Sequence, residues 1–247
     1  MTTTTIQTNP IKIFNQELAI DAYLAQPTEA GSFPGVVVIQ EIFGVNAHIR
    51  DVTERFAKAG YIAIAPAIYQ RLAPGFEVGY TDADVKLGRV YKEQTKADEL
   101  LGDIQAAIAY LKALPNIQPN NIGCIGFCFG GHVAYLAATL PDIKATASFY
   151  GAAIPTWCPG GGEPTLNRTP TIQGTLYGFF GTADPSIPPD HVDAIEAALQ
   201  QNAIPHRIFR YDGAQHGFFC DQRASYHPTY AAEAWQEVQT LFSSTLK

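Results

Sequence analysis

The sequence is short of basic residues, cysteine and long apolar runs, and each shortage excludes a class of protein. Lysine and arginine number 16 against 23 aspartates and glutamates, a formal net charge of −7. This argues against a nucleic-acid or anionic-membrane partner, because such partners need clustered positive charge. No apolar stretch reaches the roughly 18 residues of a membrane span. The four cysteines show no zinc-ligand spacing, so we expect free thiols.

The N-terminal stretch is rich in threonine and lacks the basic and apolar regions of a secretory signal. We therefore expect a cytoplasmic protein with a flexible segment at residues 1–10. The length of 247 residues, 47% of them hydrophobic, suffices for a sizeable core without a disulfide or cofactor. We expect a single α/β domain over residues 1–247 and, as the default state, a monomer.

The apolar pattern predicts a hairpin followed by a parallel sheet. Apolar and polar residues alternate over 11–13 and 18–25, on either side of a turn at 15–16. Continuous apolar runs at 36–39 and 62–65 are typical of strands that are buried on both faces of a parallel sheet.

Helical and strand patterns then alternate along the chain. Residues 49–59 have a helical period that stops at Gly60. The later helices are expected at 98–114, 132–140, 191–201 and 229–242, and the later strands at 121–125, 145–150, 175–180 and 206–211. This repetition predicts a doubly wound, mainly parallel sheet flanked by helices, with an N-terminal antiparallel hairpin.

A cysteine stands where a nucleophile elbow holds its serine. Residues 126–131 read Gly-Phe-Cys-Phe-Gly-Gly and lie between a predicted strand and a predicted helix, the context of the G-x-S-x-G turn. The backbone at such a nucleophile is strained and its neighbours must be small, a demand that Gly126 and Gly130 meet. We predict that Cys128 is the nucleophile of a thiol hydrolase.

A thiol nucleophile needs a base, and the base needs an acid that fixes its tautomer. Asp184 follows the strand predicted at 175–180, and His216 follows the strand predicted at 206–211. In an open α/β sheet these strand ends collect at the edge where ligands bind. The order Cys128, Asp184, His216 is the order of α/β-hydrolases, so we predict this triad.

The other polar residues near strand ends receive secondary interpretations. The backbone amides of Ile42 and Phe129 are the predicted oxyanion-hole donors. Glu41 is either a solvated loop carboxylate or a group that controls the thiol, because it stands at the same sheet edge as Cys128. The other histidines lack a strand-end setting and are interpreted as surface or capping residues: His48, His132, His191, His206 and His227.

Four stretches occur in order over nearly the whole chain: Gln-Glu-Ile-Phe-Gly-Val-Asn at 40–46, the elbow at 126–131, Asp184, and Gly-Ala-Gln-His-Gly at 213–217. Together they resemble the dienelactone hydrolase family of α/β-hydrolases. The resemblance implies carboxymethylenebutenolidase chemistry, hydrolysis of a cyclic enol lactone to maleylacetate, without metal or organic cofactor. It also implies that Glu41 takes up the thiol proton of Cys128 when substrate binds.

In this family two arginines bind the substrate carboxylate, and Arg71 matches the first. A guanidinium suits a carboxylate because it binds both oxygens at once. The second arginine is expected four residues after His216, where this chain has Cys220; Arg223 either reaches into the site or is a surface charge. This departure keeps other functions open, namely a carboxylesterase for a different small ester, or a scaffold that binds a carboxylate or lactone with negligible turnover.

The glycine-rich loop at 155–170 either borders the active-site mouth or is a plain surface insertion. The aromatic residues near the motifs either shape an apolar pocket or belong to the core: Phe43, Phe127, Phe129, Trp157, Phe218 and Phe219. A redox pair of Cys124 and Cys128 is disfavoured, because a cysteine within a buried strand points away from the elbow.

Overall fold

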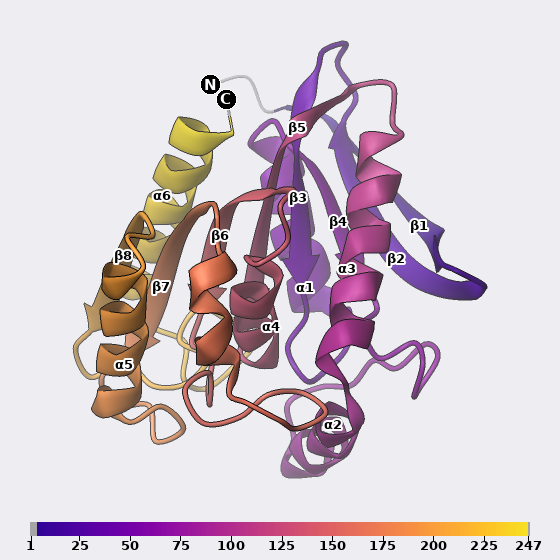
Figure 1. Cartoon of the computed structure of the whole chain (residues 1–247). Coiled ribbons are helices and arrows are strands. Elements are labelled where there is room, and N and C mark those ends of the chain that lie inside the picture. The colour runs from indigo at the N-terminus through magenta and orange to yellow at the C-terminus, as the bar shows by residue number, and fades with distance from the viewer. Residues whose placement is uncertain (1–3, 247) are drawn as a thin grey trace.

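The computed structural model describes residues 4–246, which form an eight-stranded sheet between two layers of helices (Figure 1). The strands are Ile6–Asn15 (β1), Leu18–Pro27 (β2), Phe33–Ile39 (β3), Ile62–Pro66 (β4), Ile117–Phe127 (β5), Ile143–Phe149 (β6), Thr175–Gly181 (β7) and His206–Tyr211 (β8). Their order across the sheet is β1-β2-β4-β3-β5-β6-β7-β8. Strand β2 pairs antiparallel with β1 and β4, and the other neighbours pair in parallel. The predicted fold is confirmed.

The helices are Ala47–Lys58 (α1), Asp82–Gln94 (α2), Ala97–Lys112 (α3), Phe129–Ala137 (α4), Pro189–Gln201 (α5) and Pro228–Thr245 (α6), with a 3₁₀ helix at Thr165–Thr171. Helices α1 and α6 cover one face of the sheet, and α3, α4 and α5 cover the other (Figure 1). Helix α2 lies beyond the edge at which the parallel strands end. Within residues 4–246 no helix combines the length and apolarity that crossing a bilayer requires.

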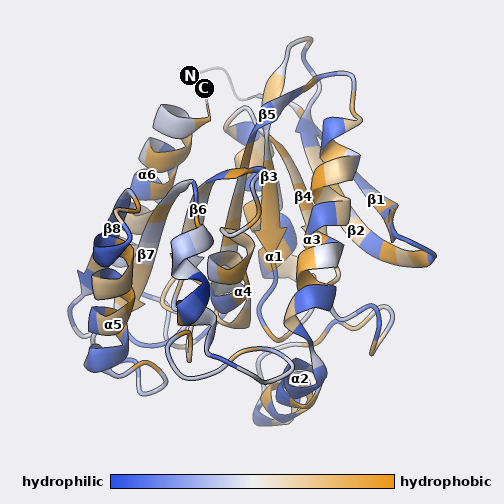
Figure 2. Ribbon diagram, in the orientation of Figure 1, coloured by the Kyte–Doolittle hydropathy of each residue, from blue (hydrophilic) through white to orange (hydrophobic). Residues whose placement is uncertain are grey.

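The central strands are buried on both faces, which explains their continuous apolar sequences. In β3, Val36 and Val38 join the cluster that contains Phe56 of α1, while Val37 and Ile39 join the cluster on the opposite face. This alternation follows from the pleat, since successive side chains of a strand point to opposite faces. Figure 2 shows the apolar colour concentrated along these central strands. The two layers therefore hold the strand ends in fixed positions.

Two segments differ from the sequence-based predictions. The flexible segment predicted at residues 1–10 is wrong for residues 6–10, which form the first half of β1 and pair with β2; residues 1–3 lie outside the described part. Helix α2 was not predicted. It begins with a capping box in which the Thr81 hydroxyl accepts from the Asp84 amide and the Asp84 carboxylate accepts from the Thr81 amide, a pairing that stabilises a helix start.

Candidate active site

Cys128 sits in a sharp turn between β5 and α4. Its backbone has φ 57° and ψ −119°, a conformation that costs about 1–3 kcal/mol for a residue with a side chain. A Cβ on Gly126 would lie 1.9 Å from the Gly130 carbonyl oxygen, and one on Gly130 would lie 2.3 Å from that of Gln40. The turn therefore requires glycine at both places, and it presents the Cys128 thiol at the carboxyl edge of the sheet.

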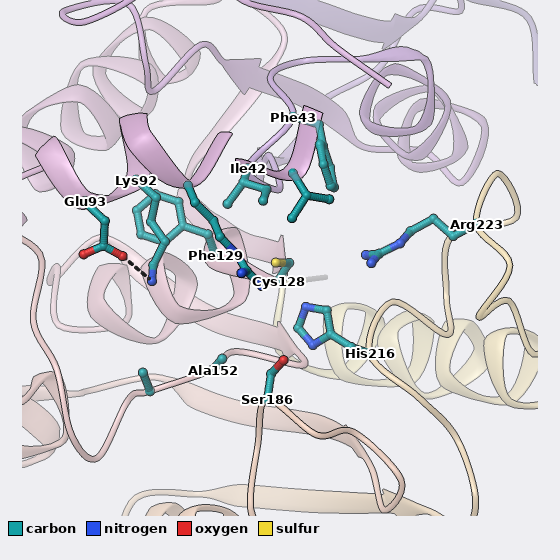
Figure 3. A pocket seen from close by; sticks show the side chains of 13 residues that line it. Ile42, Phe43, Lys92, Glu93, Cys128, Phe129, Ala152, Ser186, His216 and Arg223 are labelled. Carbon is teal, nitrogen blue, oxygen red and sulfur yellow. Dashed lines mark hydrogen bonds and ion pairs between the residues drawn. The ribbon is translucent and has the colours of Figure 1, made fainter. Parts of the chain in front are cut away.

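Asp184 and His216 lie at the ends of β7 and β8, as the sequence predicts. Nδ1 of His216 is 2.6 Å from Oδ2 of Asp184. The other oxygen of Asp184 accepts from the Ser186 amide at 2.8 Å, and the aspartate side chain is fully buried. This geometry fixes the ring orientation of His216. Figure 3 shows the imidazole directed toward the Cys128 sulfur.

The electrostatics of His216 depend on Cys128. Burial by itself lowers the pKa of His216, but the electrostatic interaction with Cys128 and the hydrogen bonds to Asp184 and Cys128 outweigh burial and raise the pKa to about 10. A raised pKa means that the imidazolium form of His216 is favoured. The arrangement therefore places a positively charged ring beside the Cys128 sulfur.

The two predicted oxyanion-hole donors border the same cavity as Cys128. Phe129 is the first residue of α4, and amides in the first turn of a helix have no acceptor within it. Ile42 follows β3, and none of the hydrogen bonds in residues 4–246 uses its amide. Helix α2 packs directly on Ile42, since a Cβ on Gly88 would lie 2.3 Å from the Ile42 carbonyl oxygen.

Glu41 and Arg223 form an ion pair beside the cavity. Nη1 of Arg223 donates to Oε1 of Glu41 at 3.0 Å, and the side chains are 20% and 0% exposed respectively. Gly217 leaves room for the guanidinium, because a Cβ there would lie 2.4 Å from Nη1 of Arg223. Glu41 is thus not a solvated carboxylate, and Arg223 is not a plain surface charge: it reaches into the site.

Figure 3 shows the side chains around the cavity at Cys128. The cavity has a volume of about 410 Å³. It is lined by Ile42, Phe43, Val85, Arg89, Lys92, Glu93, Cys128, Phe129, Ala152, Ala153, Ser186, His216 and Arg223. Four of these residues come from α2. They were not among the predicted site residues, although Thr81 and Asp84 are the sequence signal of a capping box. The loop at 155–170 does not line the cavity; the two alanines just before it do.

Arg71 lies outside this cavity, and its predicted role in substrate binding is corrected. Nη2 of Arg71 is 2.7 Å from Oδ1 of Asp103, whose side chain is 1% exposed. The same oxygen accepts from Nδ2 of Asn15 at 2.8 Å. Arg71 borders a separate hollow together with Thr95 and Glu99. The guanidinium of Arg71 is therefore bound by the buried carboxylate of Asp103, away from Cys128.

Two histidines that were interpreted as surface or capping residues are buried instead. His132 is 1% exposed, and its ring nitrogens lie 2.8 Å from the Ala152 carbonyl and 2.7 Å from the Thr165 hydroxyl. Burial lowers the pKa of His132 to about 4. His48 is fully buried. His227 does cap a helix, because its ring accepts from the Tyr230 amide at the start of α6.

The aromatic residues divide between pocket and core. Phe43 and Phe129 line the cavity. Phe127, Phe218 and Phe219 are at most 1% exposed and belong to the core cluster. All four cysteines are free thiols, as predicted.

The class of protein follows from the fold and the site. The sheet is mainly parallel and lies between helices, a cysteine occupies a nucleophile elbow after β5, and an aspartate and a histidine follow β7 and β8. This is the arrangement of an α/β-hydrolase. The sequence model of the Dienelactone hydrolase family matches residues 20–246. The chain therefore belongs to the dienelactone hydrolase family, and it is an enzyme that hydrolyses ester or lactone bonds. The resemblance seen in the sequence is confirmed.

Named relatives agree with this membership. A Synechocystis sp. (strain PCC 6803) protein named "Putative carboxymethylenebutenolidase" is 59% identical over 99% of this chain and 100% of its own. A Bradyrhizobium sp. protein named "Probable 2-oxo-3-(5-oxofuran-2-ylidene)propanoate lactonase" is 32% identical over 87% of this chain and 85% of its own. A solved Klebsiella pneumoniae structure described as a "Putative Dienelactone Hydrolase" is 31% identical, with a TM-score of 0.86 over 97% of this chain and 99% of that one.

Proposed function

We propose that this enzyme is a cysteine-dependent lactonase of the carboxymethylenebutenolidase type that acts through a thioester with Cys128. The observation that carries the proposal is the Cys128 thiol on a strained elbow beside His216, which Asp184 holds at 2.6 Å. The names of the Synechocystis and Bradyrhizobium relatives, a butenolidase and a lactonase, support a small lactone as the substrate.

Acylation begins with the Glu41–Arg223 pair. A substrate carboxylate that draws Arg223 toward it leaves Glu41 as a buried carboxylate without a cation, which is unfavourable. Glu41 relieves this state by taking the thiol proton of Cys128. The sulfur then bonds to the lactone carbonyl carbon, and the amides of Ile42 and Phe129 bind the oxyanion. The ring C–O bond breaks, and the enolate oxygen keeps the electron pair.

Deacylation returns the enzyme to its starting state. Water attacks the thioester carbonyl and gives a proton to the enolate. The C–S bond breaks, and Cys128 recovers its proton from Glu41 while the new carboxyl group loses its proton to solvent. The imidazolium of His216 stabilises the sulfur anion before attack and after release, in keeping with its raised pKa. A thiolate that forms only with substrate bound is also protected from oxidation.

A second candidate is a cysteine-dependent esterase for an uncharged small ester. It is favoured by the position of Arg71, which is held by Asp103 outside the cavity. In that case Arg223 stays with Glu41, and α2 shapes the pocket without binding a carboxylate.

Cys128→Ala tests the thioester mechanism, assayed with dienelactone and with a panel of uncharged aryl esters. We expect kcat to fall by about 10³-fold or more on every substrate that the wild type hydrolyses, because the attacking atom is gone. Cys158→Ala is the matched control, since it removes a buried thiol elsewhere. Activity of Cys128→Ala near that of the wild type would refute the proposal. If the wild type hydrolyses uncharged esters but not dienelactone, the enzyme is the esterase of the second candidate, with the same thioester mechanism.

A further inference from the structure

A buried cluster of three potential metal ligands includes Glu41, the carboxylate that pairs with Arg223 of the active-site cavity. Glu41, His48 and Cys220 each offer one donor atom, and these three atoms lie within 4.8 Å of one another. All three residues are fully buried. They come from the loop after β3, the first turn of α1 and the segment after His216, so only the folded chain brings them together.

The cluster holds polar atoms that no protein group satisfies. Oε2 of Glu41 and both ring nitrogens of His48 have no hydrogen-bond partner among the described residues. The ring of His48 is instead surrounded by aromatic rings, with centroids at 5.7 Å for Phe127 and 6.2 Å for Phe219. Orphaned buried atoms of this kind are costly, and their presence on two of the three residues of one cluster indicates a bound species.

The chemical types of the three donor atoms indicate which kind of ion the cluster binds. A carboxylate oxygen, an imidazole nitrogen and a cysteine sulfur are the ligands that zinc takes in proteins, whereas calcium and magnesium prefer oxygen alone. We propose that Glu41, His48 and Cys220 bind a thiophilic divalent cation of the zinc class, with water as a fourth ligand. On binding, the Cys220 thiol releases its proton to solvent. Ligand distances of about 2.0–2.3 Å require the three side chains to close in slightly.

Because Arg223 is so near, the bound cation exchanges with free cation in solution. Its guanidinium already binds Oε1 of Glu41 at 3.0 Å, so a cation at Oε2 meets an adjacent positive charge and binds less tightly than a closed structural zinc. The cation and Arg223 therefore compete for one carboxylate, and occupancy follows the free metal concentration.

Binding inhibits the enzyme. Glu41 that is coordinated to a cation cannot accept the thiol proton of Cys128, so the thiolate does not form when substrate arrives. This inhibition depends on the proposed role of Glu41, whereas the binding itself does not, and the two are tested separately.

Binding is measured in a Cys128→Ala background, which removes the competing Cys128–His216 thiol and imidazole site. Titration with Co²⁺ is expected to give a near-ultraviolet thiolate-to-cobalt band, and titration calorimetry is expected to give one Zn²⁺ per chain. Adding Cys220→Ala abolishes the band, and adding His48→Phe, a substitution that suits the surrounding aromatic rings, weakens Zn²⁺ binding by at least about tenfold. Adding Cys158→Ala changes neither. Circular dichroism verifies that each variant is folded.

Absence of Zn²⁺ binding in the Cys128→Ala protein, or binding that survives both Cys220→Ala and His48→Phe, would overturn the site. Inhibition is measured with Cys128 intact, as the apparent zinc inhibition constant of His48→Phe and wild type, each relative to its own metal-free rate. A rise of tenfold or more in His48→Phe supports inhibition through Glu41. An unchanged constant assigns the inhibition to Cys128 and His216 and refutes that step.

Discussion

The molecule contains two arginine–carboxylate pairs of similar length whose surroundings differ. Arg71 meets Asp103 at 2.7 Å, and Arg223 meets Glu41 at 3.0 Å; both carboxylates are at most 1% exposed. Asp103 also accepts from Asn15, and so connects α3 to the hairpin. The second oxygen of Glu41 has no hydrogen-bond partner within residues 4–246, and Arg223 lines the cavity that contains Cys128.

The Arg71–Asp103 pair stabilises the fold, whereas the Arg223–Glu41 pair is able to exchange partners. Arg71 and Asn15 both donate to Oδ1 of buried Asp103, and Arg71 does not border the cavity from which another anion could replace this carboxylate, so the pair at Asp103 stays closed. The pair at Glu41 has one donor and lies next to a cavity, so a substrate anion, a thiol proton or a cation is able to replace Arg223. Residue type and distance alone do not distinguish the two pairs; the remaining partners of the carboxylate do.

The largest effect expected from this comparison is on catalysis by Glu41→Gln. Glutamine has the same shape and still accepts from Arg223, but it cannot take the thiol proton. We expect kcat to fall by about 10²–10³-fold, with the protein still folded. Asp103→Asn is the matched control and keeps the wild-type kcat. Equal kcat values for wild type and Glu41→Gln would remove Glu41 from the mechanism.

The next effect contrasts an arginine of the core with one of the pocket. Arg71→Ala lowers the free energy of unfolding by about 2–3 kcal/mol, because buried Asp103 loses its cation, and leaves KM unchanged. Arg89 lines the cavity beside Cys128, and we expect it to contact the substrate carboxylate there. Arg89→Ala therefore changes stability by about 0.5 kcal/mol or less, but raises KM for dienelactone about tenfold. Urea unfolding and steady-state kinetics on both variants measure these changes. The reverse pattern would show that the two arginines have been assigned the wrong way round.

The sequence predicts best what the sheet itself positions. Cys128, Asp184 and His216 each follow an apolar strand, and parallel strands end at one edge, so their meeting follows from the strand pattern. The role of Arg71 was wrong because its partner Asp103 lies 32 residues away on α3, a contact that no local pattern contains. His48 was missed for the same reason: its burial among aromatic rings is a tertiary property.

The smallest effect expected is on the pH dependence of the free energy of unfolding. It again distinguishes the active site, which contains His216, from the core pair of Arg71 and Asp103. The pKa of His216 is about 10 in the folded protein against 6.5 for the free side chain. The folded state therefore binds the proton more tightly, so the stabilisation is complete below pH 6.5 and is lost as the pH rises toward 10. We expect the free energy of unfolding, measured in urea with a reductant at pH 6 to 10, to decline for wild type and for Arg71→Ala alike. His216→Gln lacks this decline, and in Cys128→Ala, which removes the sulfur that interacts with His216, the decline shifts to lower pH. A profile of His216→Gln that runs parallel to that of the wild type would mean that the pKa of His216 is not raised in the folded protein.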